Sequence, residues 1–303
     1  MNSANEASGA GGVPVVEARG LTKTYGTTRA LDKINLSIGA GRIVGLIGPN
    51  GAGKTTTLKS ILGLAPYEGE LRVLGLNPYS ERARLMQDVC FIADVAVMPR
   101  WLKVSDAIDF VSGIHPRFNR ARADAFLSKT EIPRNARVKQ LSKGMVTQLH
   151  LALVMAIEAR LLVLDEPTLG LDIIYRKRFY DTLLNDYFSN EDSLEQARTI
   201  IVTTHQVEEI ENILTDVIFI GHGRVVLDLP MDSIADRFTQ LSISSERLAE
   251  ARALGPIHEH ESIGRSLLYF ENVDRKRLAA LGDVRTPGLA DLFVAKLSGS
   301  AGA

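Results

Sequence analysis

Short apolar segments alternate with amphipathic segments over most of the 303-residue chain. From Leu31 to Ile38 apolar and polar residues nearly alternate, which predicts a strand with one buried face. Further strands are expected at Val15–Arg19, Arg42–Ile47, Glu70–Leu74, Val89–Ala93, Leu161–Leu164, Thr199–Thr204 and Val217–Ile220. Helical spacing is found at Lys54–Leu62, Val104–Ile114, Arg120–Thr130, after Gly144, at Ile173–Phe188 and at Gln206–Leu214. This alternation predicts an α/β fold with a mostly parallel sheet.

The pattern of apolar and polar residues also predicts how the chain is divided into domains. Residues 1–14 are rich in Gly, Ala, Ser and Asn and are expected to form a disordered tail. The main domain is expected at 15–230, and a helical subdomain without strand patterns interrupts it at about 95–158. Residues 231–303 read as a small α+β accessory region, whose role as a regulatory module, a dimerisation element or a partner contact stays open.

The amino-acid composition argues against three features: nucleic-acid binding, an intramolecular disulfide and a membrane span. Lys and Arg number 35 against 36 Asp and Glu, for a net charge of −1, which argues against a nucleic-acid binder. Cys90 is the single cysteine, so no intramolecular disulfide can form, which fits a reducing cytoplasm. The most apolar stretch, Leu149–Leu164, is interrupted by charged residues and is too short for a membrane span.

The segment after the Arg42–Ile47 strand carries a phosphate-loop pattern, G-x-x-x-x-G-K-[ST], and a helix follows it. Glycines let successive N–H groups turn toward phosphate oxygens, Lys54 supplies a cation, and Thr55 offers a hydroxyl to Mg²⁺. The alternative is a glycine-rich turn with a chance lysine. The expected nucleotide-binding residues here are Gly48, Pro49, Asn50, Gly51, Ala52, Gly53, Lys54, Thr55 and Thr56.

Two carboxylates, Asp165 and Glu166, end the apolar strand that begins at Leu161. In an open α/β sheet, ligands bind at the carboxyl ends of the strands. Asp165 is therefore expected to hold Mg²⁺, and Glu166 to polarise the attacking water as a general base. His205 follows the next strand in the same way and is a second catalytic candidate. The alternative reading is a strand that ends in solvated acids.

The order of these motifs resembles the nucleotide-binding ATPase subunit of ABC transporters over roughly residues 15 to 230. The segment Leu141–Met145 precedes the acidic strand, Thr168–Asp172 follows it, and His205 comes later. The form of the Leu141–Met145 segment is similar to that of some bacterial exporter ATPases, including those of the antibiotic-resistance type. The resemblance implies a P-loop fold of ABC type, with an antiparallel part in a mixed sheet, an inserted helical subdomain and a small appendage.

The resemblance also implies roles for single residues. Ser142 and Gly144 match the signature motif, which caps the γ-phosphate of ATP on the opposite subunit, although Ser142 can equally be a plain helix N-cap. Asp172 matches a loop that crosses the dimer interface, and His205 the histidine that contacts the γ-phosphate. Tyr25 stands where an aromatic stacks on adenine.

Three positions depart from the family pattern. Asp94 occupies the place of a glutamine that couples the site to the membrane partner, and its carboxylate is expected near Mg²⁺ or the water. Lys143 replaces a glycine and Met145 a glutamine of the signature. The following segment, Met98–Leu102, is a candidate surface for the membrane partner, in which Trp101 is either exposed at an interface or a core residue.

The resemblance therefore implies an ATPase that uses ATP and Mg²⁺, pairs head to tail with a second copy or a homologous subunit, and drives a separate membrane permease. It implies a cytoplasmic protein, peripheral on the inner face of the membrane. Two alternatives stay open: a soluble ABC-type ATPase, and a non-hydrolysing nucleotide sensor.

Overall fold

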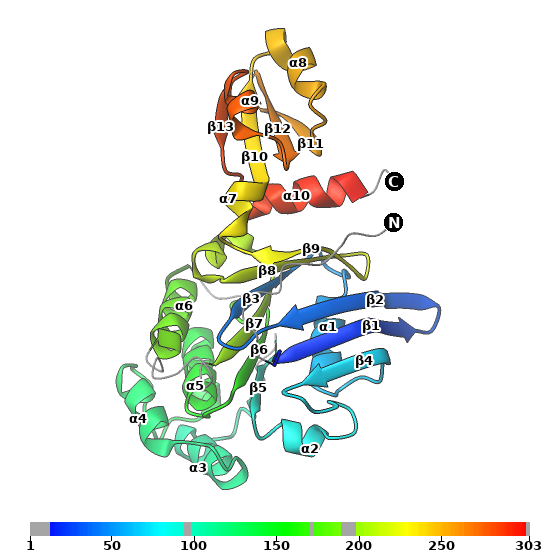
Figure 1. Cartoon of the computed structure of the whole chain (residues 1–303). Helices are drawn as coiled ribbons and strands as arrows, with labels where there is room; N and C mark the ends of the chain where they lie inside the picture. The colour runs from blue at the N-terminus through cyan, green and yellow to red at the C-terminus, as the bar shows by residue number, and fades with distance from the viewer. Residues whose placement is uncertain (1–12, 94–97, 170–172, 189–197, 263, 301–303) are drawn as a thin grey trace. The chain divides into compact units, whose positions relative to one another are not determined.

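The structure is a computed structural model that describes residues 13–93, 98–169, 173–188, 198–262 and 264–300 (Figure 1). The chain divides into two compact units. The first comprises Met1–Arg42 with Thr55–Ile201, and the second comprises Ile43–Lys54 with Val202–Ala303. The phosphate-loop segment therefore groups with the C-terminal part of the chain.

An antiparallel sheet opens the first unit, in the order β2-β1-β4. Its strands are β1 (Val16–Tyr25), β2 (Thr28–Ile38) and β4 (Glu68–Val73). The sequence predicted that the first strand ends at Arg19, but β1 continues to Tyr25. The register of β1 against β2 shifts between Ala18 and Leu21, where Gly20 has a φ of 61°. A bulge of this kind breaks the alternation on which the prediction relied.

The first unit also holds the β5-β6-β7 end of a larger sheet. The strand β5 (Val89–Ile92) runs parallel to β6 (Leu161–Asp165), and every residue of β6 is buried. The last strand, β7 (Thr199–Thr204), runs from this unit into the second. The accompanying helices are α1 (Lys54–Ile61), α2 (Arg82–Leu85) and α6 (Ile173–Phe188).

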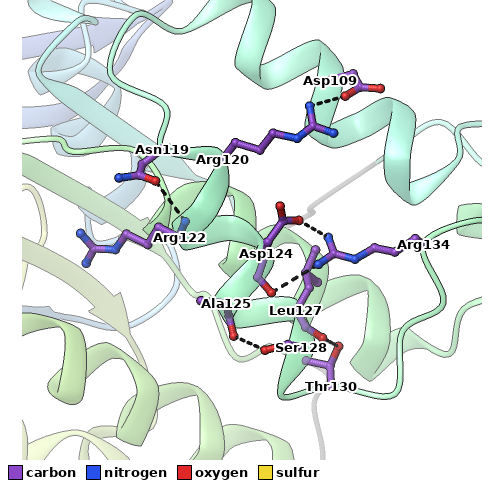
Figure 2. Close-up of polar contacts among 10 residues, drawn as sticks. All are labelled: Asp109, Asn119, Arg120, Arg122, Asp124, Ala125, Leu127, Ser128, Thr130 and Arg134. Carbon is purple, nitrogen blue, oxygen red and sulfur yellow. Dashed lines mark hydrogen bonds and ion pairs between the residues drawn. The ribbon is translucent and has the colours of Figure 1, made fainter.

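A helical region follows β5, as predicted, and no strand lies among its described residues. It contains α3 (Val104–Ile114), α4 (Arg120–Ser128), the 3-10 turn η1 (Val138–Gln140) and α5 (Lys143–Met155). These helices pack around a core that includes Val104, Ile108, Leu127 and Leu149. On its surface, Asn119 caps α4, and Asp109 and Asp124 pair with Arg120 and Arg134 (Figure 2).

The second unit holds the other end of the larger sheet, in the order β7-β3-β8-β9. The strand β3 (Ile43–Ile47) is parallel to β8 (Asp216–Gly221), which pairs antiparallel with β9 (Arg224–Pro230). A tight hairpin turn joins β8 to β9. Its two central residues, His222 and Gly223, both have positive φ, which suits a two-residue hairpin.

A separate four-stranded sheet follows, in the order β11-β12-β10-β13 (Figure 1). Leu241, Leu268 and Phe270 of this sheet form one core with Ala251 and Leu278 of two short helices. The elements are α7 (Ser233–Arg237), β10 (Phe238–Ile243), η4 (Ser245–Arg247), α8 (Leu248–Arg252), β11 (His258–Ser262), β12 (Arg265–Glu271), α9 (Arg275–Ala279), β13 (Asp283–Arg285) and α10 (Leu289–Ser300).

The last helix, α10, buries its apolar stripe. Leu289 and Leu292 are fully buried, and α10 contacts both β9 and β11. Phe293 stacks edge-on against Phe219 of β8, with ring centroids 5.1 Å apart. The stripe therefore packs against the larger sheet as well as against the C-terminal sheet.

One predicted helix, Gln206–Leu214, is wrong. The segment forms two 3-10 turns instead, η2 (Val207–Glu209) and η3 (Glu211–Ile213). Its apolar residues Val207, Ile210 and Ile213 recur every third residue, which matches the three residues per turn of a 3-10 helix. The fold class itself, an α/β core with an antiparallel part and an inserted helical region, is confirmed.

Candidate functional site

The phosphate loop follows β3, all of whose residues are buried. Gly51 and Gly53 have φ values of 80° and 112°, which other residue types rarely adopt. A Cβ on Gly48 would lie 2.5 Å from the Ile220 carbonyl oxygen and 3.0 Å from the Ala52 Cβ. Three glycines of the loop are therefore needed for its tight backbone turn. A turn of this kind lets successive N–H groups point toward a bound phosphate.

Three hydrogen bonds also fix the conformation of the loop. The Ala52 N–H donates to the Pro49 carbonyl at 3.1 Å, and the Gly223 N–H of the β8–β9 turn donates to the Ala52 carbonyl at 3.0 Å. Lys54 is buried, and its ammonium donates to the Gly48 carbonyl at 2.6 Å. The cation therefore lies against the loop that it follows, where it can also reach a phosphate bound by that loop.

The sequence places Thr55 at the start of α1 and Asp165 at the end of β6, and the structure brings them together. The Thr55 hydroxyl donates to the Asp165 carboxylate at 3.3 Å. Asp165 is buried at the end of a fully buried strand. A hydroxyl and a carboxylate in contact are oxygen donors of the kind that Mg²⁺ prefers. These two residues therefore fit a magnesium ion.

Glu166 follows in a strained backbone conformation. It is half-buried, and its φ of 47° lies in the left-handed region, which costs a glutamate about 1–2 kcal/mol. Strain of this kind persists where the surrounding structure enforces it, and it clusters at functional sites. The next residues are fixed by burial, because Pro167 and Thr168 are both buried and the Thr168 hydroxyl lies 3.3 Å from the Tyr180 hydroxyl.

Ser142 and Gly144 lie at the N-terminus of α5. The Ser142 hydroxyl accepts a hydrogen bond from the Met145 N–H at 3.2 Å, so the structure shows the N-cap. Gly144 is buried, whereas Ser142 and Lys143 are exposed. A nucleotide contact of these residues stays a prediction.

Two further predicted residues lie at strand ends. His205 directly follows β7 and is exposed. Tyr25 ends β1, is 47% exposed, and has the Lys23 ammonium 4.8 Å from its ring centroid. This cation–π contact was missed, although the spacing of two residues along a strand could have suggested it. Asp94 and Asp172 lie outside the described residues.

Burial shifts the pKa of two groups in the first unit. It raises the pKa of the Cys90 thiol in β5 to about 12, an effect that the positive charge of Arg198 opposes. It lowers the pKa of His150 in α5 to about 4. Both side chains are therefore neutral at physiological pH.

Sequence reasoning also missed Glu211, whose carboxylate accepts a hydrogen bond from the Leu289 N–H at 3.1 Å. This contact attaches the N-terminus of α10 to the segment that follows His205. The two residues are far apart in the sequence, so no local pattern could indicate their pairing.

The chain is similar to several known proteins. A family model described as "ABC transporter" matches residues 31–169. The Nod factor export ATP-binding protein I of Sinorhizobium fredii (strain NBRC 101917 / NGR234) is 30% identical over 306 residues, which cover 92% of this chain and 84% of that protein.

Solved structures show the same fold. A structure described as an ATP-binding subunit of an ABC transporter has a TM-score of 0.64 at 22% identity, covering 73% of this chain and 91% of that chain. A dimeric ATP-binding cassette in a post-hydrolysis state, bound to ADP and Pi, has a TM-score of 0.62 at 22% identity. That match covers 71% of this chain and 98% of the other.

Proposed function

The chain belongs to the family of ATP-binding subunits of ABC transporters and is an ATPase, and we propose that it powers transport through a separate membrane permease. In this proposal Mg-ATP is bound between two head-to-tail subunits. The observation that carries it is the hydrogen bond between Thr55 and Asp165, which joins the start of the phosphate-loop helix to the acidic strand.

Different residues bind the phosphates, hold the metal ion and accept the proton. The loop N–H groups of 48–56 and the Lys54 ammonium bind the phosphates. Thr55 and Asp165 would hold Mg²⁺, which would neutralise phosphate charge. Water attacks the γ-phosphorus, Glu166 accepts its proton, and the bond from that phosphorus to the β-phosphate oxygen breaks to give ADP and phosphate. His205 contacts the γ-phosphate.

The remaining predicted residues complete the nucleotide site. In the proposal Tyr25 stacks on adenine, and the Asp94 carboxylate would act on the magnesium ion or the attacking water. Ser142 and Gly144 cap the γ-phosphate bound by the partner copy, and Asp172 lies in the loop that crosses the interface. A relative of the same fold was solved as a dimer with ADP and Pi, which supports this arrangement.

A permease on another chain supplies the membrane path. Among the described residues, no helix is both long and apolar enough to cross a membrane. The proposed subunit binds the permease at the inner face of the membrane. Because the relative from Sinorhizobium fredii carries the name of an export protein, we propose export as the direction.

The experiment uses full-length Glu166→Gln protein, with size-exclusion chromatography and light scattering. A monomer that becomes a dimer only with Mg-ATP is expected, because a bound nucleotide that is not hydrolysed keeps the two copies together. The matched control is Lys54→Ala, which loses the phosphate-binding cation and should stay monomeric.

A protein that stays monomeric with ATP contradicts self-pairing.

A further inference from the structure

The turn between β8 and β9 lies against the phosphate loop at two points. The Gly223 N–H in the turn donates to the Ala52 carbonyl at 3.0 Å. Just before the turn, the Ile220 carbonyl oxygen lies so close to Gly48 that a Cβ added to this glycine would be 2.5 Å away from it. The path of the phosphate loop therefore depends on where this turn lies.

The last helix packs onto the same turn. A Cβ added to Gly221 would lie 2.5 Å from the Cδ2 atom of Leu297 in α10. The Leu297 side chain thus reaches the backbone of β8 at a position where only a glycine leaves room for it. In the sequence, Gly221 stands between Ile220 and Gly223, the two residues that contact the phosphate loop. Leu297 therefore packs on the stretch of backbone that supports this loop.

The contact of Leu297 is part of a longer interface between α10 and β8. Phe293 stacks edge-on against Phe219, with ring centroids 5.1 Å apart. Phe293 comes four residues before Leu297 in the helix, and Phe219 comes two residues before Gly221 in the strand. Four residues of helix advance about 6 Å and two residues of strand about 6.6 Å, so the two contacts have matching spacing. The helix therefore runs alongside the end of β8 and contacts it at two successive positions.

The ladder between β8 and β9 is irregular close to the turn. Its register shifts between Phe219 and Ile220. Two residue pairs lie between that shift and the turn: Ile220 with Val225, and Gly221 with Arg224. A shift of this kind interrupts the ladder hydrogen bonds. The position of the turn therefore depends on its contacts with the loop and with α10 as well as on the ladder.

The helix itself is anchored along its length. At its start, the Leu289 N–H donates to the Glu211 carboxylate at 3.1 Å. Near its end, the Lys296 ammonium donates to the carboxylate of Glu271 in β12 at 2.9 Å. Helix ends usually fray, but these contacts hold α10 as far as the residue before Leu297. Leu297 is therefore a fixed support for the turn.

We propose that Leu297 is a positioning residue for ATP binding, which acts through the β8–β9 turn to keep the phosphate loop in the conformation that binds the nucleotide. Backbone N–H groups bind phosphate oxygens well only within a narrow range of distance and angle. A small shift of the loop therefore weakens several hydrogen bonds at once. The inference rests on the phosphate-binding role proposed above for the loop 48–56.

The test compares full-length variants by titration with a fluorescent ATP analogue and by steady-state ATP hydrolysis. Leu297→Ala should raise the Kd for the analogue and the KM for ATP at least about fivefold, whereas kcat should stay within about twofold of the wild type. Leu297→Met keeps the side-chain volume and should bind like the wild type. Leu297→Val, which removes less of the side chain than alanine does, should give an intermediate affinity.

Two controls separate positioning from a general loss of stability. Val294→Ala changes a side chain of the same helix that is 53% exposed, and it should leave nucleotide affinity unchanged. Leu278→Ala truncates a fully buried side chain in the core of the C-terminal sheet, so it should lower the melting temperature without weakening ATP binding. Hydrogen exchange gives a second readout. At the Gly223 amide, which donates to Ala52, exchange should be at least about tenfold faster in Leu297→Ala than in either control.

Two results would overturn the inference: wild-type nucleotide affinity in a folded Leu297→Ala protein, or an equal loss of affinity in Leu278→Ala. Lys54→Ala separates the inference from the proposed function, because it removes the phosphate-binding cation itself. If Lys54→Ala binds ATP like the wild type, the proposed phosphate site fails and the inference fails with it. If Lys54→Ala loses binding and Leu297→Ala keeps it, the site stands and only the positioning by Leu297 is refuted.

Discussion

His150 makes the stability of the first unit depend on pH. It lies in α5, the helix that Ser142 caps, and it is half-buried. Burial lowers its pKa from 6.5 to about 4. Between these values the unfolded chain binds a proton that the folded chain does not, so stability falls as pH falls through this window. Well above pH 6.5 the imidazole is neutral in both states, and the effect disappears.

The size of the effect follows from the two pKa values. At pH 5.5 they give a loss of at most about 1.4 kcal/mol relative to neutral pH. Because the side chain keeps some contact with water, we expect about 1 kcal/mol. For a unit of this size, that lowers the melting temperature by about 2–4 °C.

The assay is thermal unfolding at pH 7.5 and pH 5.5, followed by circular dichroism. The variant His150→Gln removes the titrating group, so its melting temperature should drop about 2–4 °C less than that of the wild type. His260→Gln is the matched control, because His260 is exposed on β11. It should keep the wild-type pH dependence. Equal drops in all three proteins would refute the burial argument.

Two further predictions concern backbone contacts. Gly48→Ala should weaken ATP binding at least about tenfold, because its Cβ would lie 2.5 Å from the Ile220 carbonyl oxygen. Gly113→Ala, where a Cβ meets nothing within 4 Å, is the control and should bind like the wild type in a fluorescent-nucleotide titration. Glu211→Ala removes the acceptor of the Leu289 N–H and should destabilise the start of α10 by about 1 kcal/mol. Faster hydrogen exchange at α10 amides measures this, and unchanged exchange would contradict the capping role.

Strong local periodicity allowed some elements to be predicted to the residue. The helices Val104–Ile114 and Ile173–Phe188 are found with the predicted bounds. The end of β1 could not be predicted, because the bulge at Gly20 interrupts its alternation. The segment Gln206–Leu214 was misjudged because a repeat of three apolar positions is close to a helical repeat in so short a stretch.

The strands that carry the candidate site were predictable for a similar reason. The phosphate loop and the acidic strand are local patterns, and the strand context of each is confirmed. Contacts between distant parts of the chain had no such signal. The hydrogen bond from Thr55 to Asp165 could be found only from the three-dimensional structure. The same is true of the hydrogen bond from Leu289 to Glu211. The like-charge pairing of Lys103 and Arg137 was equally invisible, because a β-bridge joins them across two otherwise irregular segments.

The most direct test of the account is the steady-state rate of ATP hydrolysis by Glu166→Gln, measured beside its affinity for ATP. If Glu166 accepts the proton of the attacking water, kcat should fall at least about a hundredfold while ATP affinity stays near that of the wild type. Hydrolysis within a few fold of the wild-type rate, with ATP bound equally well, would contradict the assignment of Glu166 as the general base.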